Sequence, residues 1–319
     1  MATVTLKSRS GKVLKEHLDI KVDIKTATVD DLKKAVYRSF PKYYASRQRL
    51  TVDGKLLEPG KPLSEYAIKA GDTVTLKDLG PQIGWTTVFI IEYFGPMIIH
   101  PLLYFFPNLF YPGAADVPHT RIQTITMVMC VLHFLKREYE TIFVHRFSND
   151  TMPITNLPKN SFHYWVLGGL LFYPVYAPGF NGGYLGGAHS DVFVAGLIAV
   201  WAWAEGSNFL THVTLRNLRP PGSRVRQIPF GYGFNWVSCP NYFFEILGWL
   251  AVSLLTGSLN AYFFFIVGAA QMYAWAVKKH IRYKKEFGSK YPRNRKRLYY
   301  AGSRETASST QRFTQTANI

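Results

Sequence analysis

The chain has 319 residues, of which 48% are hydrophobic and 16% aromatic, and its formal net charge is +17 at pH 7. This length leaves room for two structural units at roughly 100–200 residues each. The cysteines, Cys130 and Cys239, lie beside or inside apolar stretches, so we expect no disulfide framework. The chain opens on a polar, charge-rich segment, so we expect no signal peptide and membrane insertion through internal segments alone.

The first 80 residues predict a small α+β domain. Short segments in this range alternate polar and apolar residues, as half-buried strands do. Thr28 precedes the acid Asp31 by three residues, the pattern of a capping box at a helix start. Asp53 and Gly54 form the turn pair of a β-hairpin. The order of elements resembles a ubiquitin-like β-grasp fold. Because residues 1–80 show no catalytic cluster, we expect partner docking there rather than chemistry.

Residues 81–297 predict a multi-span, all-α membrane domain. Six apolar runs occur here, at 85–110, 121–135, 161–178, 191–212, 242–257 and 259–277. Several approach the roughly 20 residues that a membrane-spanning helix needs. Pro96 and Pro101 interrupt the first run, which can therefore bend or split there. The prediction is six transmembrane helices, with seven as the alternative.

The connecting segments predict which side of the membrane each loop occupies. Lys and Arg lie in alternate connectors and after the last run, and the remaining connectors, 111–120, 179–190 and 256–260, contain none. Because basic loops stay in the cytosol, six spans place both termini on the cytosolic face. Excess positive charge can also indicate nucleic-acid binding. A membrane-embedded body instead favours membrane lipid and phosphorylated ligands, and we expect no nucleic-acid partner.

Two side chains at apolar runs are candidate catalytic groups. Glu92 lies inside the first run, where a carboxylate is costly and indicates a functional site. The alternative is an acid buried and hydrogen-bonded for structural reasons. Tyr242 follows Pro240 and Asn241 at the start of the fifth run. A phenol there can donate a hydrogen bond or a proton to a substrate, although tyrosine is also common at the membrane interface.

Polar side chains also recur at the end of the fourth run. Asn208, His212, Arg216 and Arg219 are spaced by four, four and three residues, which predicts that they share one helical face. Amide and imidazole groups leading to guanidinium groups suit a ligand with a polar body and an anionic end, because arginine forks onto phosphate. The alternative is that the arginines contact lipid headgroups.

Other patterns are given no function. The glycosylation sequon at 149–151 falls on the predicted cytosolic side, and the glycine-rich connector 182–187 lacks the spacing of a dinucleotide fingerprint. The scattered histidines His133, His145 and His163 lack ligand spacing, so we expect no metal.

Together these features resemble a trans-2-enoyl-CoA reductase of very-long-chain fatty-acid elongation, within the steroid 5α-reductase family. The segments that carry the resemblance are 137–153, 208–220, 228–229, 238–242 with Glu245, and 280–292. The ubiquitin-like head and the join at 77–85 match the enoyl-CoA reductases rather than the steroid reductases. The similarity covers roughly residues 1–297.

The resemblance implies a multi-pass enzyme of the endoplasmic reticulum membrane that works beside other elongation-cycle enzymes. It implies transfer of hydride from NADPH to the β-carbon of a long-chain enoyl-CoA, and of a proton to the α-carbon. Tyr242 would donate the proton or polarise the carbonyl, and Glu92 would be a second acid. The residues that fall where the family holds its cofactor are Asn208, His212, Arg216, Arg219, Asn241, Tyr283 and Tyr291.

The chain departs from the family pattern at two places. Relatives end in a short apolar segment soon after the Tyr-Pro pair, whereas residues 298–319 here form a Ser/Thr-rich tail that we predict to be disordered. Phe134 stands where some relatives carry a tyrosine beside the active site, which would alter substrate orientation.

Two other functions fit parts of the pattern. A steroid or polyprenol enone reductase would use the same groups on the same scaffold. A non-catalytic membrane adaptor would use the ubiquitin-like head to recruit partners, but it would have no need of Glu92, Asn208 and Tyr242.

Overall fold

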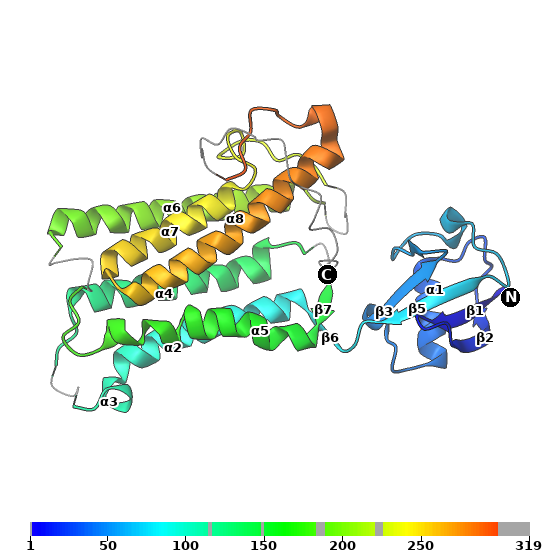
Figure 1. Ribbon diagram of the computed structural model, residues 1–319, viewed down its shortest axis with the longest axis horizontal. Helices are drawn as coiled ribbons and strands as arrows, with labels where there is room; N and C mark the ends of the chain where they lie inside the picture. The colour runs from blue at the N-terminus through cyan, green and yellow to red at the C-terminus, as the bar shows by residue number, and fades with distance from the viewer. Residues whose placement is uncertain (1, 114–116, 148–149, 183–188, 221–225, 299–319) are drawn as a thin grey trace. The chain divides into compact units, whose positions relative to one another are not determined.

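The structure is a computed structural model that describes residues 2–113, 117–147, 150–182, 189–220 and 226–298. The chain divides by its contacts into two compact units, residues 1–183 and 184–319. The first unit contains a head built on a β-sheet and a group of helices, and the second is helical (Figure 1). The predicted tail, 298–319, lies outside the described residues except for Leu298.

The head is a five-stranded sheet with one long helix packed against it (Figure 1). Its elements are β1 (Ala2–Ser8), β2 (Val13–Ile20), α1 (Val29–Ser39), β3 (Gln48–Val52), β4 (Lys55–Leu56) and β5 (Thr73–Asp78). The strand order is β2-β1-β5-β3-β4, and β1 runs parallel to β5. The order of strands and helix predicted for residues 1–80 is therefore confirmed.

Local chemistry explains where these elements begin and turn. Asp31 donates its backbone N–H to the Thr28 hydroxyl, and its carboxylate accepts from the Thr28 backbone N–H at 3.1 Å. Such a cap stabilises a helix by about 1 kcal/mol. Asp53 and Gly54, at φ 46° and 77°, make the tight turn between β3 and β4, because a two-residue hairpin turn of this kind requires positive φ at both positions.

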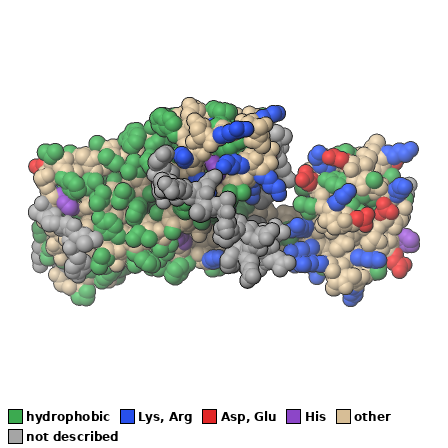
Figure 2. Space-filling model, turned by 45° about the horizontal axis from the view of Figure 1, so that its top comes forward, with side chains coloured by type: hydrophobic (Ala, Val, Ile, Leu, Met, Phe, Trp, Pro, Cys, Tyr) green, Lys and Arg blue, Asp and Glu red, His purple; other side chains and the backbone are tan. Residues whose placement is uncertain are grey.

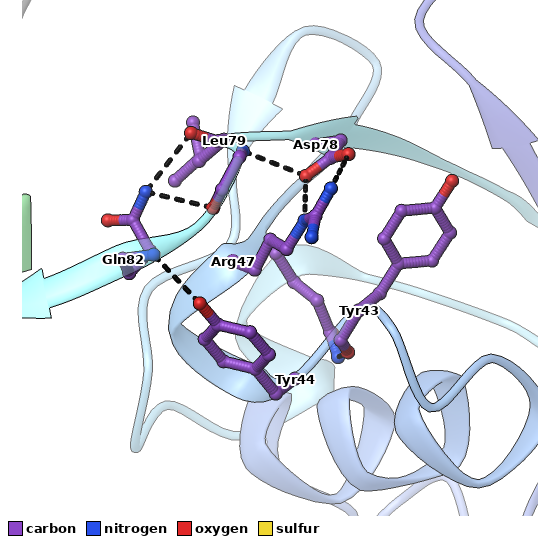
Figure 3. A network of polar contacts seen from close by, with 8 residues as sticks. Tyr43, Tyr44, Arg47, Asp78, Leu79 and Gln82 are labelled. Atoms are coloured by element: carbon purple, nitrogen blue, oxygen red, sulfur yellow. Dashed lines mark hydrogen bonds and ion pairs between the residues drawn. The ribbon is translucent and has the colours of Figure 1, made fainter. Parts of the chain in front are cut away.

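The end of β5 and the residues that follow it are tied to the segment that precedes β3 (Figure 3). The Arg47 guanidinium pairs with the Asp78 carboxylate at 2.7 Å, the Leu79 N–H donates to the Arg47 carbonyl at 2.9 Å, and the Gln82 N–H donates to the Tyr44 hydroxyl at 2.7 Å. The hydrogen bond from Arg47 holds the pKa of Asp78 below its usual range. The ion pair is therefore present at neutral pH and is lost as the pH falls through that lowered value.

A short ribbon then connects the head to the helices of the first unit. Strand β6 (Gln82–Gly84) pairs antiparallel with β7 (Thr151–Pro153). The backbone extends this pairing, since the Ile154 N–H donates to the Pro81 carbonyl at 2.9 Å and the Trp85 N–H to the Asp150 carbonyl at 3.1 Å. The predicted boundary at residue 80 falls between β5 and β6, in a join whose backbone is hydrogen-bonded on both sides of it.

The first unit has one long pair of helices. Its helices are α2 (Trp85–Phe105), α3 (Pro107–Phe110), α4 (Arg121–Tyr139) and α5 (Leu157–Phe162), and α2 packs against α4. Helix α2 continues through Pro96 and Pro101 and ends at Phe105, so the first apolar run does not split at these prolines. Proline removes the hydrogen bond to the carbonyl four residues earlier, which for Pro96 is the carbonyl of Glu92.

The third apolar run, 161–178, does not form one regular α-helix. It folds as the end of α5, a π-helical turn at His163–Leu167 and a 3₁₀ helix at Leu170–Tyr176. Adjacent glycines at 168 and 169 separate the π-helical turn from the 3₁₀ helix, because glycine favours breaks in a helix. Pro174 lies within the 3₁₀ helix. The run is therefore helical over most of its length, and the predicted span here stays a prediction.

The second unit consists of three long helices that lie side by side (Figure 1). They are α6 (Asp191–Asn217), α7 (Pro240–Thr256) and α8 (Leu259–Phe287), and α7 packs against both α6 and α8. Gly257, at φ 58°, ends α7, which is the left-handed position that glycine favours at a helix end. Four of the predicted apolar runs thus correspond to α4, α6, α7 and α8.

Among the described residues, α2 and α6 are long and apolar enough to cross a membrane. On α2 the side chains of Phe94, Ile98 and Leu102 are exposed and lie four residues apart on one face, as expected for a surface in contact with lipid. Apolar side chains cover much of the helical part, whereas acidic side chains gather on the head (Figure 2). The six to seven spans remain a prediction.

Asp78→Ala should loosen the join between the head and the ribbon. Removing the carboxylate breaks the ion pair with Arg47 and the hydrogen bond from the Gly80 N–H. We expect faster amide hydrogen exchange at residues 79–84 of the full-length protein at neutral pH. Asp19→Ala, at an exposed acid on β2, is the control and should leave exchange unchanged. Equal exchange in the Asp78 variant and the wild type would contradict the structure of this join.

Gly95→Ala should destabilise the first unit. A Cβ at Gly95 would lie 2.2 Å from the indole ring of Trp165, whose N–H donates to the Ile91 carbonyl at 2.8 Å. Overpacking of this kind costs about 1–3 kcal/mol, so the melting temperature in detergent should fall. Gly196→Ala, in α6 with open space around its Cα, is the matched control. It should be neutral or slightly stabilising, because alanine is the better helix former.

Candidate functional site

The second unit gathers the residues predicted around Tyr242 at the start of α7. Pro240 is the first residue of this helix, and Asn241 and Tyr242 follow in its first turn. Proline is compatible with this position, since its missing N–H would have no partner in the helix. Asn241 is 5% exposed and Tyr242 is half-buried. The predicted threshold of the fifth run is therefore a helix N-terminus lined with polar side chains.

Asn208 joins α6 to α7. Its amide nitrogen donates to the Asn241 carbonyl at 2.8 Å and to the Glu245 carboxylate at 3.1 Å. Asn208 itself is 1% exposed. The side-chain amide of Asn208 on α6 therefore donates two hydrogen bonds to α7. Its structural role is to hold these two helices together.

Asn241 offers an unused acceptor inside the unit. Its side-chain oxygen, Oδ1, is buried and has no hydrogen-bond partner within the described part of the chain. Leaving a buried polar atom unsatisfied costs about 1–3 kcal/mol, and native structures rarely tolerate this without a reason. An amide or hydroxyl donor of a bound ligand would satisfy it.

The stacked row predicted along α6 is correct for three of its four members. Asn208, His212 and Arg216 are four residues apart within α6 and share a face. Helix α6 ends at Asn217, however, so Arg219 lies beyond it in a tight turn, with its N–H donating to the Arg216 carbonyl at 3.1 Å. The predicted continuation of the helical face to Arg219 is wrong, because the chain leaves the helix before Pro220.

The hydroxyl of Ser238 connects three segments of the second unit. It is hydrogen-bonded to His280 Nδ1 at 2.6 Å and to the Tyr291 hydroxyl at 2.7 Å, and it donates to the Lys296 carbonyl at 3.1 Å. Ser238, His280 and Tyr291 are all buried. This network holds α8 and the segment after it against the entry to α7. Sequence reasoning recognised the motif around Ser238 but not its hydroxyl as the centre.

Tyr283 and Tyr291 lie together, as the predicted cofactor set requires. Their rings are stacked, with centroids 5.6 Å apart and an interplanar angle of 21°. Arg219 lies near enough to act electrostatically on Tyr283. The structure thus brings Arg219 near Tyr283 and Tyr291, which follow it in the sequence by 64 and 72 residues.

Arg295 is a further candidate that sequence reasoning missed. It is 3% exposed, and its guanidinium carbon lies 5.0 Å from the Phe230 ring and 5.1 Å from the Tyr291 ring. Its Nε and Nη1 are buried with no hydrogen-bond partner among the described residues. A buried guanidinium with unused donors is suited to an anion. In the sequence Arg295 is one of several basic residues in a row, and only packing distinguishes it.

Tyr242 faces α8 and the segment that follows that helix. It packs with Cys239, Ala276 and Leu298, all of which are at most 1% exposed. Its ring centroid lies 6.1 Å from that of Trp275. The ring of Tyr242 is therefore packed mainly against apolar side chains.

Glu92 belongs to the first unit, on α2. It is 2% exposed, and its Oε1 has no hydrogen-bond partner in the described segments. The adjacent Tyr93 accepts a hydrogen bond from Arg137 at 2.8 Å, and Arg137 also pairs with Glu140 at 2.7 Å. The acid is therefore buried, as predicted, with one oxygen left for a further partner.

Comparison with known proteins matches both parts of the chain. The ubiquitin family matches residues 4–77, and the family described as 3-oxo-5-alpha-steroid 4-dehydrogenase matches residues 150–299. A putative enoyl reductase of Schizosaccharomyces pombe is 48% identical over 92% of this chain and 97% of its own. The very-long-chain enoyl-CoA reductase of Dictyostelium discoideum is 44% identical, over 86% and 91%. A probable very-long-chain enoyl-CoA reductase of Caenorhabditis elegans is 39% identical, over 85% and 90%.

Proposed function

Because the chain belongs to the very-long-chain enoyl-CoA reductase family, we propose that it reduces the trans-2 double bond of a long-chain enoyl-CoA with NADPH. The product is the saturated acyl-CoA, and the reaction is the last step of fatty-acid elongation. The observation that carries the proposal is the start of α7, where a phenol in apolar packing follows a buried amide oxygen with no partner among the described residues.

Tyr242 is the proposed proton donor. When hydride reaches the β-carbon of a conjugated thioester, negative charge develops on the α-carbon and on the thioester oxygen. A hydroxyl held in an apolar environment can neutralise that charge by hydrogen bonding to the oxygen or by giving its proton to the α-carbon. The half-buried ring of Tyr242 packs against Cys239, Ala276 and Leu298, and this apolar packing supports the role.

The donors and acceptors of the second unit fit a nicotinamide dinucleotide. Such a cofactor, when bound, supplies the hydride. The unsatisfied Oδ1 of Asn241 suits an amide donor such as the nicotinamide carboxamide, and the unused Nε and Nη1 of Arg295 suit a phosphate. Arg216 and Arg219 would bind the remaining phosphates, and Tyr283 and Tyr291 offer stacked aromatic rings. In this proposal Asn208 and His212 support the site from α6.

Glu92 is proposed as a second acid that holds the substrate carbonyl. Its support is its own environment: a buried carboxyl group on α2 with an oxygen that no described residue satisfies. The proposed location is the endoplasmic reticulum membrane with both termini in the cytosol, supported by the alternation of basic connectors. Membrane lipid and other elongation-cycle enzymes are the proposed partners.

A steroid enone is the second candidate substrate. The match of residues 150–299 to the family described as 3-oxo-5-alpha-steroid 4-dehydrogenase supports this candidate. Purified protein in detergent should be offered a long trans-2-enoyl-CoA and a steroid enone in parallel, with NADPH oxidation as the readout. Turnover of the enoyl-CoA alone is the expected result, and preference for the steroid would reverse the assignment.

Tyr242→Phe should lower kcat by about 100-fold or more, because general acid catalysis contributes about 10²–10⁴-fold. Binding of NADPH, measured by fluorescence titration, should be nearly unchanged, since the ring and its packing remain. The control is Tyr262→Phe, which should keep full turnover. Tyr262 is also a half-buried tyrosine, but it lies on α8. Normal turnover by the Tyr242 variant would refute the assigned role.

Arg219→Ala should weaken NADPH by about tenfold, as the loss of a hydrogen bond to a charged group does, and should weaken NADH less. The reason is that the additional phosphate of NADPH loses its guanidinium partner. Arg226→Ala is the matched control, because Arg226 is paired with Glu286 at 3.0 Å. KM for each cofactor is the measurement. An equal effect on NADPH and NADH would mean that Arg219 does not discriminate between them.

A further inference from the structure

Lys279 is the basic residue of α8 that contacts the proposed proton donor. Its Nζ lies over the Tyr242 ring, 5.1 Å from the ring centroid. The preceding residue, Lys278, is exposed, whereas Lys279 is partly buried. Two adjacent lysines therefore occupy different environments, and one of them is directed toward the start of α7.

The surroundings of Lys279 do not explain its burial as an ion pair. The groups of the described chain that act electrostatically on its ammonium are the phenols of Tyr242 and Tyr283 and the thiol of Cys239. None of these is a carboxylate, and each can acquire negative charge only by losing a proton. Partial burial of an ammonium group without a carboxylate partner carries a desolvation cost. Such a cost is common where the charge has a task in the site.

We propose that Lys279 is a positioning residue that acts through Tyr242. Its ammonium group holds the ring of Tyr242 in place through the contact over the ring face and stabilises the negative charge that appears on the phenolic oxygen during catalysis. The proposal deepens the function proposed above and rests on it. The observation behind the proposal is the contact between Lys279 and Tyr242, which arises where α8 packs against α7.

The chemistry balances without another reactant. Hydride from the reduced nicotinamide forms the new C–H bond at the β-carbon, and the electron pair of the double bond moves to the α-carbon and the thioester oxygen. The O–H bond of Tyr242 then breaks as the proton forms a C–H bond at the α-carbon. The phenolate that remains lies beside the ammonium of Lys279, and a proton from water restores the phenol before the next turnover.

A double-mutant cycle separates this role from a structural one. Lys279→Met should lower kcat by about tenfold or more in the wild-type background, with KM for NADPH and for the enoyl-CoA changed less than twofold. In the Tyr242→Phe background the same substitution should have almost no further effect, because interacting residues are not additive. Lys279→Arg, which keeps the charge and a donor, should recover a large part of kcat.

Controls make each outcome decisive. Lys278→Met removes the same charge from the exposed neighbour and should behave as the wild type. Lys279→Gln serves as a second neutral variant if Lys279→Met fails to fold, as judged by thermal melting in detergent. Equal effects of the Lys279 substitution in both backgrounds, or a rise in KM for NADPH alone, would overturn the proposal. An active wild type with unimpaired Lys279 variants would overturn it and leave the proposed function intact. A wild type inactive on enoyl-CoA would overturn both.

Discussion

The hydrogen bonds of the Ser238 hydroxyl hold together the segments that form the proposed site. One oxygen atom is shared by the imidazole of His280, the phenol of Tyr291 and the backbone carbonyl of Lys296. The pairing of Val237 with Lys296 continues the attachment through the backbone. Because Tyr242 and Lys279 each lie within four residues of this network, it fixes the relative position of the start of α7 and the end of α8. Aromatic rings and a buried guanidinium then pack against a rigid frame.

The second unit tolerates its buried polar atoms in two different ways. The side chains of Asn208 and Ser238 have hydrogen-bond partners within the unit, and these bonds connect its segments to one another. Asn241 Oδ1 and two side-chain nitrogens of Arg295 have no hydrogen-bond partner in the described chain. In a well-packed protein the second kind is rare. Asn241 lies three residues after Ser238 and Arg295 directly before Lys296, so both border the hydrogen bonds of Ser238. The same contrast holds in α2. His100 is held by Tyr176 at 2.8 Å and Gly168 at 2.9 Å, whereas one oxygen of Glu92 is left without a partner among the described residues.

Much of the fold could be predicted from the sequence because local rules decide it. The capping box at Thr28 and the Asp53-Gly54 turn are short-range signals, and the structure confirms both. Within the run 161–178 the change from a π-helical turn to a 3₁₀ helix falls at Gly168 and Gly169, and the apolar length of the run does not reveal it. Burial of Arg295 was beyond sequence reasoning, because a basic residue in a basic segment is distinguished only by what packs around it. Helical spacing likewise could not reveal that α6 ends before Arg219.

The pairing of β6 with β7 determines what a cleavage of the chain near this ribbon leaves behind. A cleavage before Gln82 would release the head and leave both strands of the ribbon paired. A cleavage after Gly84 would remove β6 and leave the backbone of residues 151–153 as an open strand edge, and exposed edges of this kind promote association between chains. Two truncated forms that differ by a few residues would therefore differ in whether β7 keeps its strand partner.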